Sequence, residues 1–322
     1  MNLAILHYHL NPGGVTRVVA NHLASLEAVA DRDWRVVVLH GGRQAGWPAE
    51  FGRDMRHVGL EVVAVPGLEY DAERAGGGEA SPDAAGELAA ALRGALAERG
   101  MTADDTVLHW HNHSLGKNVA VPGAAERRAR DGFATLLEIH DFAEDFRPVN
   151  YAVQSRSAAD AAIYPRATHV AYALLNRRDL RTLTTAGAPQ DSAHLLPNPV
   201  AAMDGLPPRD AARAELAARF DVPVMGRFVV YPVRGIRRKN VGEMLLWSAL
   251  AGENAWFGIT LAPLNPAELA FYADWRRTSQ NLGLPCRFEV GGEGGLTFAE
   301  NLAAADAILN TSVTEGFGMV FL

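Results

Sequence analysis

The sequence predicts an α/β fold built from two doubly wound, Rossmann-like domains with parallel sheets. Three observations support this prediction. Short apolar runs, typical of buried parallel strands, alternate with segments of helical periodicity along the chain. The alternation is interrupted by the proline-rich residues 196–208 and then restarts. The length of 322 residues matches two domains of about 150 residues each. We therefore expect domains at residues 1–199 and 200–322.

In the first domain, Gly13 and Gly14 lie between the first strand and the first helix. Two glycines allow the backbone to approach a phosphate, and a helix N-terminus favours its charge. An ordinary strand–helix turn explains the pair equally well, and the absence of GxGxxG disfavours a nicotinamide site. The expected strands cover residues 3–6, 34–39, 62–65, 106–108, 134–139 and 168–171, with helices near residues 15–26 and 88–96.

His140 and Asp141 follow the expected strand 134–139 at its carboxyl end. A neutral imidazole there could hydrogen-bond a sugar hydroxyl, whereas a lone histidine is more often structural. We interpret the polar stretch after it as a loop whose mixed donors and acceptors suit a sugar acceptor. The acceptor-side candidates are Asp141, Arg147, Asn150 and Tyr151.

His109, His111 and His113 alternate along another strand and therefore share a face. No cysteine or carboxylate with ligand spacing lies beside them in the sequence, so we expect a pocket of imidazole and aromatic groups and no metal. The chain has no GxSxG elbow, and Cys286 has no assignable histidine partner. A nucleophilic hydrolase is therefore poorly supported.

In the second domain, four cations lie within residues 234–239, after the expected strand 228–233. We expect Arg234 to close this strand and Lys239 to open the next helix. In a chain of net charge −7, cations at the carboxyl end of a parallel strand favour a phosphate site over a solvated basic loop. Other expected strands cover residues 256–261, 287–290 and 307–310, and helices cover 210–220, 241–250, 266–280 and 298–305.

Close to the end, Glu315 precedes Gly316, Phe317, Gly318 and Met319. The glycines permit close approach, an expected helix start favours an anion, and an ionised Glu accepts hydrogen bonds from sugar or ribose hydroxyls. A glycine-containing turn with a surface Glu is the competing interpretation of this motif.

Composition limits the class of partner and the setting. A net charge of −7 argues against general, sequence-independent binding to nucleic acids. Cys286 is the chain's only cysteine, which fits a reducing compartment, so we expect a cytoplasmic protein. No apolar run approaches the roughly 20 residues that cross a bilayer. We expect no transmembrane segment, although peripheral membrane contact is compatible with this composition.

Together, these motifs resemble the family 4 glycosyltransferases, retaining enzymes of the GT-B fold with two facing Rossmann-like domains. The resemblance implies transfer of a hexose, with retention, from a nucleotide diphosphate sugar to a carbohydrate or other hydroxyl acceptor, without a cofactor. The matching segments appear in the family's order along the chain: Gly13-Gly14-Val15, His140, Pro197-Asn198, Arg234 with Lys239, and Glu315-Gly316-Phe317-Gly318.

The resemblance also implies roles for individual residues. Arg234 and Lys239 would hold the diphosphate, His140 would contact the donor sugar, and Glu315 would hold sugar hydroxyls; these four form the expected catalytic set. Electrostatic stabilisation of this kind is typically worth about 3 kcal/mol of barrier for each donor. The expected donor-binding backbone comprises Gly13, Gly14, Gly316, Phe317, Gly318 and Met319.

One departure from the family concerns the end of the chain. The family motif continues with a second Glu, which here would follow Leu322, and then with further strand–helix units. We therefore expect a chain truncated at its C-terminus, with an incomplete second domain. The missing Glu keeps a non-catalytic nucleotide-sugar-binding protein open as an alternative, and a GT-B sugar-nucleotide epimerase is a weaker one.

Overall fold

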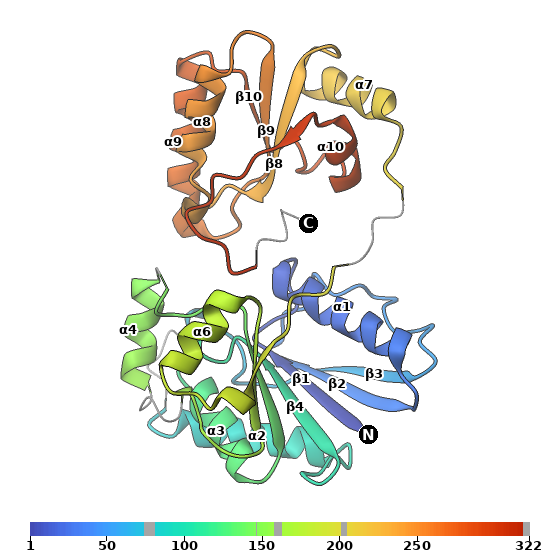
Figure 1. Ribbon diagram of the computed structural model, residues 1–322, viewed down its shortest axis with the longest axis vertical. Helices are drawn as coiled ribbons and strands as arrows, with labels where there is room; N and C mark the ends of the chain where they lie inside the picture. Colours follow the sequence, from blue (N-terminus) through green and yellow to red (C-terminus); the bar gives the residue numbers. More distant parts are fainter. Residues whose placement is uncertain (74–80, 146, 158–162, 201–204, 318–322) are drawn as a thin grey trace. The chain divides into compact units, whose positions relative to one another are not determined.

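The computed structural model describes residues 1–73, 81–145, 147–157, 163–200 and 205–317. The chain forms two compact units, Met1–Ala201 and Ala202–Leu322, each with a parallel sheet of its own (Figure 1). We expected the boundary after residue 199, and the structure divides the chain after residue 201.

The first unit contains a seven-stranded sheet in the order β3-β2-β1-β4-β5-β6-β7. All neighbouring strands are parallel. The order reverses between β1 and β4, the kind of switch point at which α/β sheets bind ligands beyond the strand carboxyl ends. The strands are β1 (Asn2–His7), β2 (Trp34–His40), β3 (Val58–Ala64), β4 (Thr106–His111), β5 (Ala134–Ile139), β6 (Val170–Leu174) and β7 (Ala193–Leu195).

Helices cover both faces of this sheet because successive strand residues point to opposite sides. On one face, α1 packs Val19 and Leu23 against Ile5. On the other, Leu92 of α2 belongs to a core with Leu6 of β1 and other strand residues. The helices are α1 (Gly14–Val29), α2 (Ala84–Ala97), α3 (Val121–Arg130), α4 (Pro148–Ser157) and α6 (Arg177–Thr185), with 3-10 turns at Asp71–Glu73 and Gln190–Ser192.

The second unit repeats this architecture on a smaller scale. Its sheet has the order β10-β9-β8-β11, again parallel, with the reversal between β8 and β11. Figure 1 shows α8 and α9 on one face of the sheet, with α7 and α10 on the other. The elements are α7 (Arg209–Phe220), β8 (Arg227–Arg234), α8 (Val241–Leu250), β9 (Ala255–Leu261), α9 (Pro266–Asn281), β10 (Cys286–Phe288), α10 (Phe298–Ala304) and β11 (Ala307–Ile308).

Local chemistry explains where several of these elements begin and end. The Asn176 side chain accepts a hydrogen bond from the Asp179 N–H and caps α6. Thr297 and Glu300 form a capping box at the start of α10. Glu289, with a φ of 64°, ends β10 before the expected strand end at residue 290.

Three sequence predictions about elements were wrong. The polar stretch after His140 is not entirely a loop, because α4 begins at Pro148, a residue whose fixed φ suits the first helical position. Asn150 and Tyr151 therefore lie on a helix. Lys239 does not open α8; it ends the 3-10 turn η3 (Arg237–Lys239), and α8 begins after the left-handed Asn240. The prediction also missed α3, α6 and β7, which have few apolar residues or are short.

Within the described part of the chain, no helix combines the length and the apolar character that crossing a bilayer requires.

Candidate functional site

The first unit carries a buried group of charged and imidazole side chains at the switch point of its sheet. This His–Glu cluster consists of His22, His109, His111, Glu138 and His140. His109 and His111 are two residues apart on β4 and share a face. Glu138 pairs with His111 across the β4–β5 ladder, and His140 follows the end of β5. His22 reaches the same carboxylate from α1.

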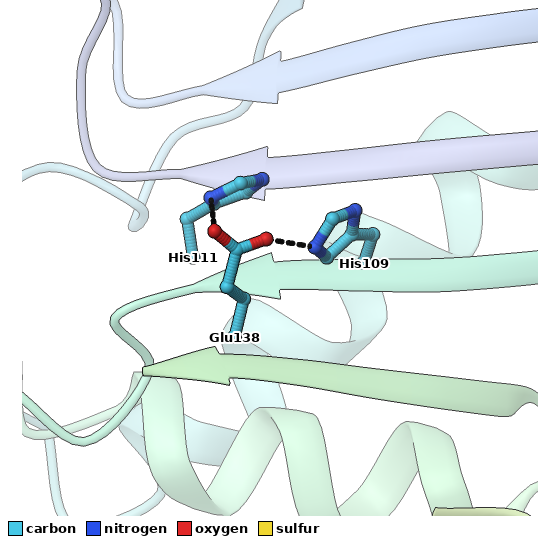
Figure 2. A group of neighbouring side chains, drawn as sticks. All are labelled: His109, His111 and Glu138. Carbon is cyan, nitrogen blue, oxygen red and sulfur yellow. Dashed lines mark hydrogen bonds and ion pairs between the residues drawn. The ribbon is translucent and has the colours of Figure 1, made fainter. Parts of the chain in front are cut away.

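Four imidazoles surround the one carboxylate. Figure 2 shows Glu138 between His109 and His111, with one carboxylate oxygen directed to each ring. His109 Nε2 lies 2.7 Å from Glu138 Oε2, and His111 Nδ1 lies 3.8 Å from Oε1. His140 Nε2 is 3.1 Å from Oε1, and His22 Nε2 is 3.2 Å from Oε2. His111 Nδ1 and His140 Nε2 are 2.9 Å apart, so at most one of them carries a proton between the rings.

Burial sets the ionisation of this cluster. It lowers the pKa of His111 well below its ordinary value, and it lowers that of His140, so both rings favour the neutral form. Burial also opposes the charge of Glu138. Attraction by His111 and hydrogen bonds from His109 and His22 outweigh that effect and hold the pKa of Glu138 well below its usual range. The surrounding imidazoles therefore favour the ionised form of Glu138.

Asn112 fixes the two strand ends that carry the cluster. It follows β4 with a left-handed φ of 59°, a conformation that Asn tolerates better than most residues. Its side-chain oxygen accepts hydrogen bonds from the N–H groups of His140 at 2.7 Å and Asp141 at 3.0 Å. Its own N–H donates to the Glu138 carbonyl at 2.8 Å. The ring of His140 is consequently held in a defined place.

The sequence has no carboxylate with ligand spacing beside the histidines, but the fold brings one to them. Glu138 is 29 residues from His109 in the chain, yet the parallel pairing of β4 and β5 places it in the cluster. The sequence did contain a pattern that could have predicted this cluster. His109 and His111 alternate along one strand, and Glu138 and His140 alternate at the end of the other. His113 lies apart from the cluster, with Nε2 2.8 Å from the Ile163 carbonyl.

The structure separates the four acceptor-side candidates. Arg147 forms a 2.7 Å ion pair with Asp141 next to His140. Asn150 is buried and donates to the Leu115 carbonyl at 2.8 Å, which is a packing role. Tyr151 is 50% exposed and lines a cavity of about 1050 Å³ that none of the other three candidates lines. The expected acceptor-side residues therefore do not form one site in the first unit.

Gly13 and Gly14 lie at the start of α1, where no side chain caps the helix. A Cβ at Gly14 would meet no heavy atom within 4 Å, and one at Gly13 would approach only the Asn11 carbonyl, at 3.8 Å. Gly13 has an extended φ of 178°, which any residue adopts. Neither conformation nor packing among the described residues requires glycine here.

The second unit carries a basic turn at its own switch point. The turn η3 follows β8, and the segment after β11 returns to lie against it. Val313 N–H donates to the Arg238 carbonyl at 3.0 Å, and Arg238 donates to the Thr314 carbonyl at 2.7 Å. The Tyr231 hydroxyl donates to the Lys239 carbonyl at 2.8 Å. The first two bonds fasten segments that are distant in sequence, and the third fixes the turn to β8.

Glu315 is bound to this turn by two cations. Its carboxylate pairs with Lys239 and lies 2.9 Å from the Arg238 guanidinium. Burial opposes the charge of Glu315, but the hydrogen bond from Lys239 and further polar contacts outweigh it and lower the pKa. The Glu315 carboxylate is thus in direct contact with Arg238 and Lys239 of the basic turn.

The other two cations of residues 234–239 have different surroundings. Arg234 donates to the Ala262 carbonyl at 3.0 Å and forms no ion pair with any residue that the structure describes. Arg237 instead stacks on Phe271, with its guanidinium carbon 4.4 Å from the ring centre. Gly316 and Phe317 are bends, and the helix start expected after them, at residues 318–322, lies outside the described residues. Gly318 and Met319 lie outside the described residues.

Comparison with known proteins gives one sequence relative and several structural neighbours. No known protein-family model matches the chain. Mannosylglucosyl-3-phosphoglycerate synthase of Petrotoga mobilis is 27% identical over 329 aligned positions, which cover all of this chain and 62% of that protein. The chain therefore spans less than two thirds of the length of this relative.

Solved structures share the fold at low identity. HepE from Anabaena, in complex with UDP and glucose, superposes with a TM-score of 0.64 at 16% identity, covering 99% of this chain and 77% of that one. Sucrose-phosphate synthase from Thermosynechococcus elongatus superposes with a TM-score of 0.63 at 14% identity, covering 99% of this chain and 77% of that one. A glycosyltransferase from Rickettsia africae superposes with a TM-score of 0.61 at 12% identity, covering 99% of this chain and 75% of that one. The predicted α/β class with GT-B-type parallel sheets is confirmed.

Proposed function

We propose that this chain is a family 4 glycosyltransferase that moves a hexose, with retention, from a nucleotide diphosphate sugar to an acceptor hydroxyl. One observation carries the proposal. Lys239 and Glu315, expected from separate motifs to bind the donor, are 76 residues apart in the chain and in direct contact at the switch point of the second sheet. The similarity to a Petrotoga mobilis sugar synthase and the shared fold support the same class.

The proposed role of the basic turn follows from the charge that develops in the reaction. When the bond between the sugar and the nucleotide diphosphate breaks, negative charge grows on the leaving phosphate. Arg234 has no ion-pair partner among the described residues, and its planar guanidinium can bind two phosphate oxygens. Lys239 adds a point charge, and Glu315 binds sugar hydroxyls. This donor chemistry needs neither a cofactor nor a divalent metal on the diphosphate.

In the first unit, the proposal assigns the donor sugar to His140 and the phosphate to the start of α1. The neutral ring of His140, held by its backbone bond to Asn112 and its contact with Glu138, could exchange hydrogen bonds with a sugar hydroxyl. The uncapped N–H groups at Gly14 favour an anion. Asp141 and Arg147, paired beside His140, remain the proposed acceptor contacts.

The acceptor is proposed to be an anionic glycoside. The name of the Petrotoga mobilis relative includes a phosphoglycerate group. Lys117 lies 5.7 Å from the ring centre of Tyr70 and forms no ion pair with a described residue. Burial and then repulsion by Arg147 lower the pKa of Lys117. A partly buried cation that forms no ion pair with a described residue is suited to a phosphate or carboxylate on the substrate.

A donor panel tests the function directly. The purified protein would be incubated with UDP-glucose and GDP-mannose, each with glucosyl-3-phosphoglycerate, its neutral glucoside analogue, or no acceptor. We expect a new glycoside with retained anomeric configuration, formed faster with the anionic acceptor. Donor binding without turnover would favour the non-catalytic alternative. A changed sugar nucleotide formed without acceptor would favour the epimerase.

Arg234→Ala tests the proposed phosphate contact. We expect kcat to fall by about 10²- to 10³-fold, as for loss of one well-placed transition-state donor. Arg237→Ala is the matched control, because it removes the same charge from a side chain that stacks on Phe271. Steady-state kinetics and circular dichroism would be measured for both variants. Equal activity of a folded Arg234→Ala variant and the control would contradict the phosphate assignment.

A further inference from the structure

The His–Glu cluster places one buried carboxylate among imidazoles. Glu138 is 0% exposed, and no lysine or arginine among the described residues forms an ion pair with it. Its ionic partners are the imidazoles of His22, His109, His111 and His140. A buried carboxylate is accommodated where it is paired and hydrogen-bonded or where it coordinates a metal. Imidazole nitrogens and carboxylate oxygens are ligands that Zn²⁺ takes in proteins.

The positions of the nitrogen atoms favour a cation. A ligand atom from each of His109, His111 and Glu138 lies within 4.8 Å of the other two (Figure 2). A tetrahedral ion with bonds of about 2.0–2.1 Å holds its ligand atoms about 3.3 Å apart. His109 Nε2 lies 2.7 Å from Glu138 Oε2, and His111 Nδ1 lies 3.8 Å from the other oxygen, Oε1. Side-chain rotations that bring the three ligand atoms from within 4.8 Å to that spacing would place them around one ion.

The contact between His111 and His140 supports the same conclusion. Their facing nitrogens are 2.9 Å apart and cannot both be protonated. One ring therefore presents an unprotonated nitrogen beside a carboxylate. A metal ion stabilises that arrangement, since a neutral imidazole and an ionised carboxylate are its ligating forms.

We propose that His109, His111 and Glu138 bind a divalent transition metal, with Zn²⁺ as the best match to two imidazoles and a carboxylate. This ligand set takes a fourth ligand in zinc proteins, and His140 Nε2, 3.1 Å from the carboxylate, is placed to supply it. The ion would join the carboxyl ends of β4 and β5 at the switch point. It would lie in the first unit, beside the His140 ring that the proposed function assigns to the donor sugar, and its binding can be measured whether or not the chain is a transferase.

Metal binding can be measured without any enzyme assay. The purified protein would be stripped with a chelator and titrated with Co²⁺, a spectroscopic substitute for Zn²⁺, while the visible d–d absorption is followed. Mass spectrometry would report the metal content of protein reloaded with Zn²⁺. We expect one equivalent per chain and a higher melting temperature with Zn²⁺. A wild-type protein that takes up neither ion would overturn the proposal.

Variants locate the site. His109→Gln and Glu138→Gln should each weaken Co²⁺ binding at least tenfold. His57→Asn is the matched control, because His57 also lies beside a carboxylate, 3.5 Å from Asp33, but on the surface and outside the cluster. Circular dichroism would verify folding, and His111→Gln would replace any variant that does not fold. Binding as tight in folded His109→Gln as in the wild type would refute the assigned ligands.

Discussion

At the scale of single residues, Gly14 and Gly235 show how a glycine required by packing differs from one left open to a ligand. A Cβ at Gly235 would lie 2.2 Å from a ring carbon of Tyr272, whereas one at Gly14 would meet nothing within 4 Å. Packing therefore explains Gly235. Gly14 keeps the start of α1 accessible, a property that matters only if another molecule approaches.

Gly14→Ala should separate stability from binding. Because alanine fits the helix start, the free energy of unfolding should stay unchanged or rise by up to about 1 kcal/mol. The added methyl group would obstruct the donor phosphate, and we expect its KM to rise by about tenfold or more, the scale of one misplaced methylene. Denaturant unfolding and donor kinetics measure the two effects. Gly235→Ala, in contrast, should lower the free energy of unfolding by about 1–3 kcal/mol, because the added methyl group overpacks the site. An unchanged KM for the donor in Gly14→Ala would contradict the assignment of the donor phosphate to the start of α1.

At the scale of elements, Asp306 fastens α7 to the second sheet. Its carboxylate pairs with Arg209 and Arg213, both on α7. It also accepts a hydrogen bond from the Phe228 N–H of β8 at 2.7 Å. Burial opposes its charge, but the Phe228 and Arg213 hydrogen bonds outweigh that effect and lower the pKa of Asp306. One side chain thus connects a helix, a strand and the loop before β11.

Asp306→Asn should destabilise the second unit in a pH-dependent way. At neutral pH we expect a loss of about 2 kcal/mol, because Arg213 stays largely buried without its counter-charge. A carboxyl whose folded pKa is depressed stabilises fully above its unfolded pKa of about 3.9, and this stabilisation is lost as pH falls through the folded value. The difference in the free energy of unfolding between the wild type and Asp306→Asn should therefore decrease as the pH is lowered. Asp274→Asn, at an exposed pair with Arg277, should have little effect at any pH. Urea unfolding at several pH values would be measured, and a constant difference would contradict the ionic role.

Sequence periodicity predicted those elements whose formation depends on apolar patterning. β1, β2, β5 and β9 were found where buried strands were expected, because parallel strands are apolar on both faces. Elements with few apolar residues, such as α6, were missed because their stability depends on caps and contacts made elsewhere. The turn η3 could not be predicted from its charges, since its end depends on the left-handed Asn240.

At the scale of the whole molecule, the order of strands explains why residues from distant motifs meet within each unit. Each sheet reverses its order beside its first strand, between β1 and β4 and between β8 and β11. The His–Glu cluster and the basic turn occupy these two positions. The sequence alone could predict that His140 and Glu315 follow strands and that Arg234 closes one. It could not predict that Glu138 would contact His109, because that contact depends on strand pairing.

Because each unit has its own sheet and cores, the two units should unfold as separate transitions that respond to different ligands. We expect calorimetry to resolve two transitions, with Asp306→Asn lowering only the one that belongs to the second unit. UDP or GDP should raise that same transition, because a ligand at 100 times its Kd adds about 2.7 kcal/mol to the unit that binds it. Zn²⁺ should raise the other, and His109→Gln should abolish this response. If nucleotide raised the transition that Zn²⁺ raises and left the Asp306-sensitive one unchanged, the assignment of the nucleotide diphosphate mainly to the basic turn of the second unit would be wrong.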